Sequence, residues 1–137
     1  MLLPAVLSSA RAARQAVCAA LFEWGCVELV EDAGLLVTEL VTNSLLHTHS
    51  PVGLKLLVRD GMFRAEVSDD DVATPEVRPA DLDAATGRGM LIVDRLASTW
   101  GVEVATGGKT VWFELPLAVP VDAGCGRRAA PREGGRC

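Results

Sequence analysis

Three polar side chains stand four residues apart in a stretch that is otherwise rich in leucine and valine. They are Glu39, Asn43 and His47. In a helix, residues spaced in this way lie along one face, and asparagine is a poor choice for a helix interior. Carboxylate and amide oxygens are ligands that Mg²⁺ takes in proteins. The pattern therefore predicts a magnesium site on a helix, with a solvated polar stripe as the alternative.

A single carboxylate interrupts the apolar face of a predicted strand. Phe63, Ala65 and Val67 alternate with polar residues, and Asp69 falls in phase with the apolar ones. A carboxylate on that face is costly unless it accepts hydrogen bonds. The amino group of an adenine would supply one, and so would a backbone N–H in the turn after the strand. Asp69 is therefore either a base-binding residue or a turn cap.

Two glycines flank an arginine directly before an apolar helical stretch, in the segment Gly87-Arg88-Gly89-Met90. Glycine permits close approach of the backbone to a ligand. The N-terminus of a helix offers free N–H groups and a positive dipole end to a phosphate, and Arg88 would add a charged donor. The segment indicates a phosphate site, with a flexible joint as the alternative.

A second glycine pair precedes Lys109 and Thr110 and looks like part of a P-loop. The full G-x-x-x-x-G-K-[ST] pattern fails, because Glu103 stands where the first glycine belongs. The residues that follow alternate as a strand, whereas a P-loop leads into a helix. Gly107-Gly108 is therefore predicted to be a hairpin turn, and Thr110 is expected to face a site between the strands.

The elements that must position these residues follow from the change of period along the chain. Helical spacing covers two N-terminal segments, the first capped by Ser8 or Ser9, and a third segment after residue 89. This order predicts the α+β class, a two-layer α/β sandwich in which a mixed, mostly antiparallel sheet carries helices on one face. The predicted helices span residues 8–24, 27–47 and 90–98; the predicted strands span residues 52–59, 62–69, 100–106 and 109–117.

Composition limits the classes of function. The chain has 137 residues, half of them hydrophobic, which predicts one domain over residues 1–117 and a disordered Gly/Arg/Pro-rich tail over residues 118–137. The net charge of −5 argues against a nucleic-acid surface, which needs clustered lysine and arginine. No apolar run approaches the ~20 residues that cross a bilayer, so no membrane partner is expected.

The four cysteines contain no C-x-x-C pair. This spacing argues against a zinc site, and a domain stapled by disulfides would be denser in cysteine. We therefore expect free thiols and a cytoplasmic location. The cysteines are Cys18, Cys26, Cys125 and Cys137.

Taken in order, these motifs resemble those of the GHKL, or Bergerat-fold, ATP-binding domains of DNA gyrase B, histidine kinases and anti-sigma-factor kinases. The resemblance covers about residues 4–117, and four motifs in the right order on the right elements make it specific. The matching residues are Glu39 and Asn43 for the N-box E-x-x-x-N, Asp69 for the adenine-binding aspartate, Gly87 and Gly89 for the second glycine box, and Thr110 for a late threonine before Leu-Pro.

The small size of the chain and the residues of its motifs are most similar to those of the anti-sigma-factor serine/threonine kinases. This resemblance implies ATP and Mg²⁺ as cofactors. By this resemblance Glu39 would position or activate the attacking hydroxyl, and Asn43 would hold Mg²⁺ on the phosphates. Asp69 would bind the adenine amino group. The other nucleotide contacts that the resemblance implies are His47, Asp71, Gly87, Arg88, Gly89, Met90 and Thr110.

The implied function is phosphorylation of a serine on a STAS-type anti-anti-sigma partner, together with sequestration of a sigma factor. The alternative is a non-catalytic module that uses nucleotide only to set its conformation. That alternative is favoured by the first glycine box, where the family has D-x-G-x-G and residues 69–73 contain no glycine. A detached histidine-kinase domain has less support, since no phosphoacceptor helix is present. A homodimer would use the apolar strand residues Leu54, Leu56 and Val58.

Overall fold

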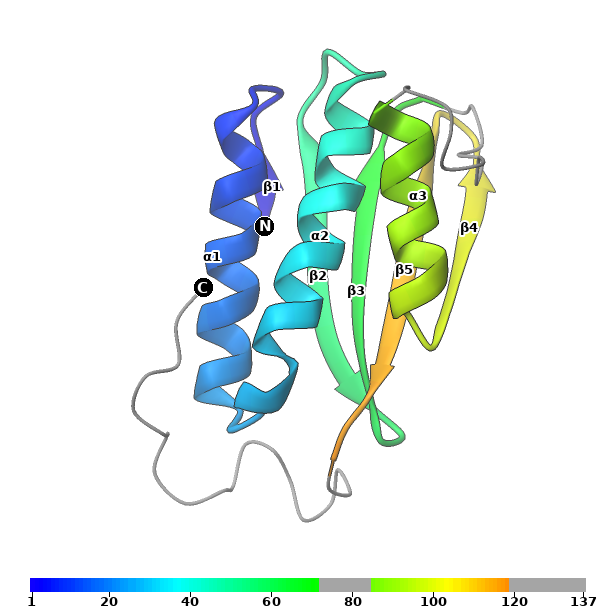
Figure 1. The fold of residues 1–137 in the computed structure, drawn as a ribbon. Coiled ribbons are helices and arrows are strands. Elements are labelled where there is room, and N and C mark those ends of the chain that lie inside the picture. Colours follow the sequence, from blue (N-terminus) through cyan, green and yellow to red (C-terminus); the bar gives the residue numbers. More distant parts are fainter. Residues whose placement is uncertain (72–84, 119–137) are drawn as a thin grey trace.

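The computed structural model describes residues 1–71 and 85–118, without the side chains of residues 85–89. In these residues the chain forms two layers, a five-stranded sheet and helices that cover one of its faces (Figure 1). The strand order is β1-β2-β3-β5-β4, and every pair of neighbours is antiparallel. The predicted fold class is confirmed, and the sheet is antiparallel throughout these residues.

The first helix, α1 (Ser8–Glu23), is close to its predicted bounds, but its start differs. Leu7 is the N-cap residue, and no side chain caps the helix. The hydroxyl of Ser9 instead donates to the backbone oxygen of Pro4 at 2.5 Å and is buried. The prediction that Ser8 or Ser9 caps the helix is therefore wrong, because the turn at Pro4 takes up that hydroxyl.

The second helix is shorter than predicted at both ends. Val27–Leu29 forms a 3₁₀ turn, η1, and α2 proper runs over Val30–Leu45. The backbone N–H groups of His47 and Thr48 both bond to the oxygen of Ser44, which ends the helix. His47 therefore lies beyond α2 and is exposed. The predicted helical stack holds for Glu39 and Asn43 and is wrong for His47.

Both predicted hairpins are present. Strands β2 (Val52–Arg59) and β3 (Met62–Asp69) have the predicted bounds, and Asp60 and Gly61 turn with φ of 57° and 77°. Two positive φ angles define the type I′ turn that suits the twist of paired strands. The second hairpin joins β4 (Thr99–Ala105) to β5 (Gly108–Pro116), so its turn is Thr106-Gly107, one residue earlier than predicted, and Gly108 begins β5. The short edge strand β1 (Leu2–Leu3) was not predicted.

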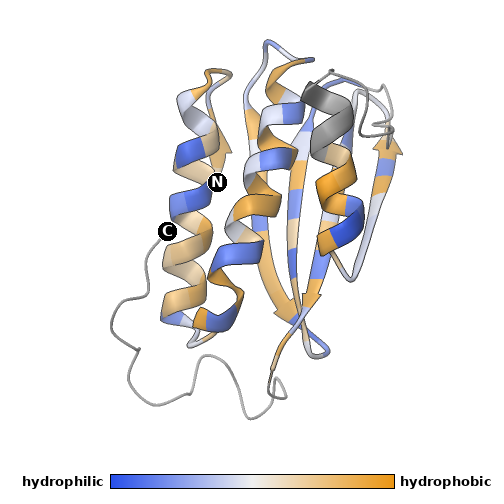
Figure 2. Cartoon of the chain, in the orientation of Figure 1, coloured by the Kyte–Doolittle hydropathy of each residue, from blue (hydrophilic) through white to orange (hydrophobic). Residues whose placement is uncertain are grey.

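The hydrophobic core is formed by side chains from the helices and from the sheet, and Figure 2 shows hydrophobic residues in both layers. Phe63 of β3 and Phe113 of β5 are fully buried at its centre, with ring centroids 6.1 Å apart. Leu54, Leu56 and Val58 of β2 also belong to this core or pack against it. The side chains that we expected to join two copies therefore lie mainly inside one chain.

The third helix, α3, spans Ala85–Leu96 and begins five residues earlier than the predicted start at Met90. Gly87 and Gly89 thus lie within its first turns. The predicted loop over residues 70–86 and the predicted tail lie almost entirely outside the described residues. Among the helices that are described, none is long and apolar enough to cross a membrane.

Cys18 and Cys26 are both disulfide-bonded, and no described cysteine is free. The expectation of free thiols is therefore wrong for these two residues. The absence of C-x-x-C spacing argues only against local pairing, and it does not limit bonds between cysteines that are distant in the sequence.

Candidate functional site

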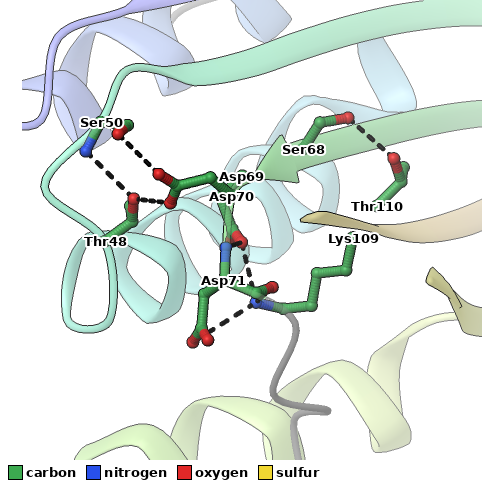
Figure 3. Close-up of polar contacts among 8 residues, drawn as sticks. All are labelled: Thr48, Ser50, Ser68, Asp69, Asp70, Asp71, Lys109 and Thr110. Carbon is green, nitrogen blue, oxygen red and sulfur yellow. Dashed lines mark hydrogen bonds and ion pairs between the residues drawn. The ribbon is translucent and has the colours of Figure 1, made fainter. Parts of the chain in front are cut away.

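One end of the molecule gathers the C-terminal ends of α2 and β3, the start of α3 and the start of β5 (Figure 1). Asp69 is the last residue of β3 and stands opposite Lys109 of β5 in the register. We call Asp69, Asp70 and Asp71 the aspartate turn. The carboxylates of Asp69 and Asp71 both lie near Lys109, whereas that of Asp70 points toward Thr48 and Ser50 (Figure 3).

Asp69 and Lys109 form a buried ion pair. Nζ of Lys109 lies 2.9 Å from Oδ1 of Asp69, and the two side chains are 2% and 0% exposed. Both residues fall in phase with the apolar face of their strands, which places them on the helix-covered side of the sheet. Charges buried to this degree persist only when they are paired. The ion pair with Lys109 thus offsets most of the free-energy cost that the sequence predicted for burying the carboxylate of Asp69.

The two oxygens of Asp69 differ in their partners. Oδ1 accepts from Nζ of Lys109 and, at 2.9 Å, from the backbone N–H of Asp71. Oδ2 is buried and has no hydrogen-bond partner among the described residues. The turn-cap alternative is therefore observed for Oδ1, which accepts from the N–H of Asp71. Oδ2 has no such partner among the described residues, so the base-binding alternative is also compatible with the structure.

Asp70 turns away from Asp69 toward the loop between α2 and β2 (Figure 3). The hydroxyl of Thr48 donates to its Oδ1, and the hydroxyl of Ser50 donates to its Oδ2 at 2.6 Å. The hydrogen bonds from Ser50 and Thr48 lower the pKa of the Asp70 carboxyl. These contacts tie the aspartate turn to the chain just after α2, and they use both oxygens of Asp70 at a distance from Asp69.

Asp71 stands where the resembling family has the first glycine after its aspartate. The only non-glycine residue with positive φ in the described chain is Asp60, so the backbone of Asp71 does not require glycine. Its carbonyl oxygen accepts from Nζ of Lys109 at 3.0 Å, and its carboxylate lies 3.8 Å from the same nitrogen. Lys109 therefore fixes the turn that glycine would otherwise shape.

Gly108 allows β5 to approach the aspartate turn closely. A Cβ at Gly108 would lie 2.2 Å from the backbone oxygen of Asp69, far inside van der Waals contact. We expect Gly108→Ala to push β5 from β3 and lower the free energy of unfolding by about 1–3 kcal/mol. Chemical denaturation measures this change.

The matched control is Gly53→Ala, also in the sheet, where a Cβ would meet its nearest neighbour, Cβ of Ser68, at 3.6 Å. This variant should be nearly as stable as the wild type. Equal stability of the two alanine variants would show that the close approach at Gly108 is not needed.

Helix α2 contributes the two polar residues that lie one turn apart. Asn43 is 7% exposed near the C-terminal end of the helix. Glu39 is partly buried, and desolvation raises the pKa of its carboxyl. General bases commonly have a raised pKa, so Glu39 is a candidate for that role.

Thr110 is not brought to this site. Its hydroxyl lies 2.9 Å from that of Ser68 on the opposite face of the sheet, away from Asp69 and Lys109 (Figure 3). Met90 of α3 is 1% exposed and belongs to the core. Sequence reasoning thus missed Lys109, Thr48 and Ser50, although the phase of Lys109 in its strand was a usable signal.

The start of α3 contributes backbone N–H groups to this end of the molecule. Gly87 and Arg88 fall among the first four residues of the helix, whose N–H groups have no partner within the helix. These N–H groups and the helix dipole favour an anion at this end. Helices α2 and α3 pack against each other (Figure 1), so such an anion would lie near the end of α2.

The sequence profile described as the histidine kinase-like ATPase domain matches residues 3–115, which is most of the chain. The chain belongs to this family. No curated protein matches the sequence. Membership in the histidine kinase-like ATPase family indicates an ATP-binding domain.

The residues of this histidine kinase-like ATPase domain fit Mg-ATP. Oδ2 of Asp69 is an acceptor without a donor in the part of the chain that the structure describes, and the adenine amino group is such a donor. No group of three or more His, Cys, Asp or Glu side chains among the described residues could hold a metal ion by itself. Mg²⁺ is commonly held by one or two protein oxygens together with phosphates and water, so Asn43 and the phosphates would suffice.

Proposed function

We propose that the domain binds Mg-ATP between the aspartate turn and the ends of α2 and α3 and acts as an anti-sigma-type serine/threonine kinase. In this proposal it phosphorylates a serine of a STAS-type anti-anti-sigma partner and sequesters a sigma factor. The observation that carries the nucleotide site is the buried Oδ2 of Asp69, an acceptor for which residues 1–71 and 85–118 provide no donor. The kinase assignment rests on Glu39 and Asn43, one turn apart on α2.

Phosphoryl transfer requires mainly positioning and neutralisation of charge. Bound ATP would supply the phosphoryl group. Asn43 would hold Mg²⁺ on the phosphates, and the free N–H groups at the start of α3 would bind the phosphate oxygens. Glu39 would accept the proton of the attacking hydroxyl. Lys109 offsets the charge of Asp69, and Asp70 is turned toward Thr48 and Ser50, which reduces repulsion of the phosphates.

A second candidate is a non-catalytic module that changes conformation with nucleotide. It is favoured by the way the aspartate turn is held on two sides, by Lys109 and by the hydroxyls after α2. A glycine-rich turn would move more freely than this one. Transfer of the γ-phosphoryl group of labelled ATP to a serine of a STAS-type partner, with ADP as the other product, separates the two candidates, since only the kinase catalyses this transfer.

The experiment that tests the nucleotide site is calorimetric titration with ATP, with and without Mg²⁺. We expect Asn43→Ala to weaken the Mg²⁺-dependent binding of ATP by at least about tenfold, or 1.4 kcal/mol. The reason is that the amide oxygen of Asn43 is the proposed protein ligand of the ion.

The control variant for this titration is Thr38→Ala on the same helix. The hydroxyl of Thr38 donates to the backbone oxygen of Gly34 at 2.8 Å, so its loss does not alter the proposed site. Thr38→Ala should bind Mg-ATP like the wild type. If the wild type binds no ATP, or Asn43→Ala binds it equally with Mg²⁺, the proposed site is wrong.

The cytoplasmic location belongs to the same proposal. The disulfide bonds of Cys18 and Cys26 count against it, because a reducing cytosol keeps thiols reduced. Alkylation of the protein within intact cells, followed by counting of modified cysteines, tests the location: modification of both residues supports the cytoplasm.

A further inference from the structure

We propose that Lys109 is a positioning residue that sets the base selectivity of the nucleotide site. It does so by holding Asp69 as a carboxylate in which Oδ1 is occupied and Oδ2 has no hydrogen-bond partner among the described residues. This inference rests on the proposed nucleotide site and adds to it a residue that none of the matched motifs assigns.

The ammonium group of Lys109 is already engaged by the protein. It has three donors; one bonds to Oδ1 of Asp69 at 2.9 Å and one to the carbonyl of Asp71 at 3.0 Å. The carboxylate of Asp71 lies 3.8 Å away, and the Lys109 side chain is 2% exposed. Lys109 is therefore not placed to bind phosphates as a P-loop lysine does. Its effect on a ligand must pass through Asp69.

The state of Asp69 determines which bases fit. With Oδ1 filled by Lys109 and by the N–H of Asp71, the carboxylate offers a ligand one acceptor, Oδ2. An ionised carboxylate cannot donate a hydrogen bond. Adenine presents an amino group to such an acceptor, whereas hypoxanthine presents a carbonyl oxygen at the same place. Two acceptors facing each other in a buried site are left unsatisfied, so the 6-oxo base is rejected.

Removal of the ammonium changes this chemistry. In Lys109→Met, the Asp69 carboxylate is buried without a counter-charge, and burial favours its neutral, protonated form. The neutral carboxyl can donate as well as accept. It would then accommodate the carbonyl of hypoxanthine about as well as the amino group of adenine, and the preference between the two bases should disappear.

The experiment compares the dissociation constants of Mg-ATP and Mg-ITP by calorimetry. We expect the wild type to prefer ATP by roughly 10- to 100-fold. Lys109→Met should reduce the preference to about threefold or less, through a loss for ATP and a relative gain for ITP. Lys55→Met, at an exposed position on β2, is the matched control and should keep the wild-type preference.

A purely structural role for Lys109 would weaken both nucleotides equally and leave their ratio unchanged. That result, or equal binding of ATP and ITP by the wild type, overturns the inference while the nucleotide site stands. If the wild type binds neither nucleotide, the proposed function itself is wrong.

Far-UV circular dichroism shows whether Lys109→Met is folded. If it is not, the double variant Lys109→Met/Asp69→Asn takes its place, because it leaves no buried charge. An asparagine amide can donate and accept, so the double variant should also lose the preference for ATP. A preserved preference in that variant would overturn the inference as well.

Discussion

Glu39→Gln is expected to slow phosphoryl transfer by about 10²- to 10⁴-fold, the range that a general base contributes. Glutamine keeps the size of the side chain and its place on α2, but it cannot take a proton from the attacking hydroxyl. The affinity for Mg-ATP should remain close to that of the wild type, since Glu39 is not assigned to binding. Transfer of the γ-phosphoryl group of labelled ATP to a serine of a STAS-type partner, under single-turnover conditions, measures the rate.

The pH dependence of this rate gives an independent readout. Burial raises the pKa of the Glu39 carboxyl, and a base acts in its deprotonated form. The wild-type rate should therefore fall as the pH decreases through that raised pKa, at a higher pH than for an ordinary glutamate. Glu39→Gln should lack this acidic limb.

Glu31→Gln is the matched control for Glu39→Gln. Glu31 is exposed in the first turn of the same helix, more than two turns before Glu39. It should keep both the rate and the acidic limb. A full rate in Glu39→Gln would contradict the assignment of Glu39 as the base, and absence of turnover in the wild type would favour the non-catalytic module.

Lys109→Met is expected to lower the free energy of unfolding by about 3–5 kcal/mol, the cost of leaving one member of a buried ion pair without its partner. This is a large share of the roughly 5–15 kcal/mol that stabilises a small domain. The pair is suited to the test because both side chains are almost completely buried. Denaturation with urea at neutral pH measures the loss.

The double variant Lys109→Met/Asp69→Leu should recover most of that stability, because neither charge is then left alone in the core. The double-mutant cycle gives the interaction energy of the pair directly. If the losses of the two single variants simply add in the double variant, the pair does not stabilise the fold through its mutual interaction.

The hairpin β2–β3 was predictable to the residue because two local signals agree. Alternation fixes the faces of the strands, and Asp60-Gly61 is suited to the two positive φ angles of the turn. The ends of the helices were less predictable. At the end of α2, the carbonyl of Ser44 accepts from both His47 and Thr48, and this competition is not visible in the hydrophobic spacing.

Some residues of the candidate site were singled out from the sequence, and others were not. Asp69 was singled out because a carboxylate stood in phase with apolar residues, and the same test applied to β5 would have found Lys109. Thr110 was carried over from a motif, although the phase of its strand places it on the other face of the sheet. The contacts of Asp70 with Thr48 and Ser50 join residues distant in sequence, and no local pattern predicts them.

The bonds from Thr48 and Ser50 to Asp70 have a thermodynamic consequence. They connect the segment that follows Asn43 to the turn that follows Asp69. The residue proposed to hold Mg²⁺ and the residue proposed to bind adenine are therefore linked through the same hydrogen bonds. Ordering of one end by a ligand then lowers the entropic cost of ordering the other. Linkage requires the effect to be mutual: the factor by which Mg²⁺ tightens the adenine nucleotide equals the factor by which the nucleotide tightens Mg²⁺.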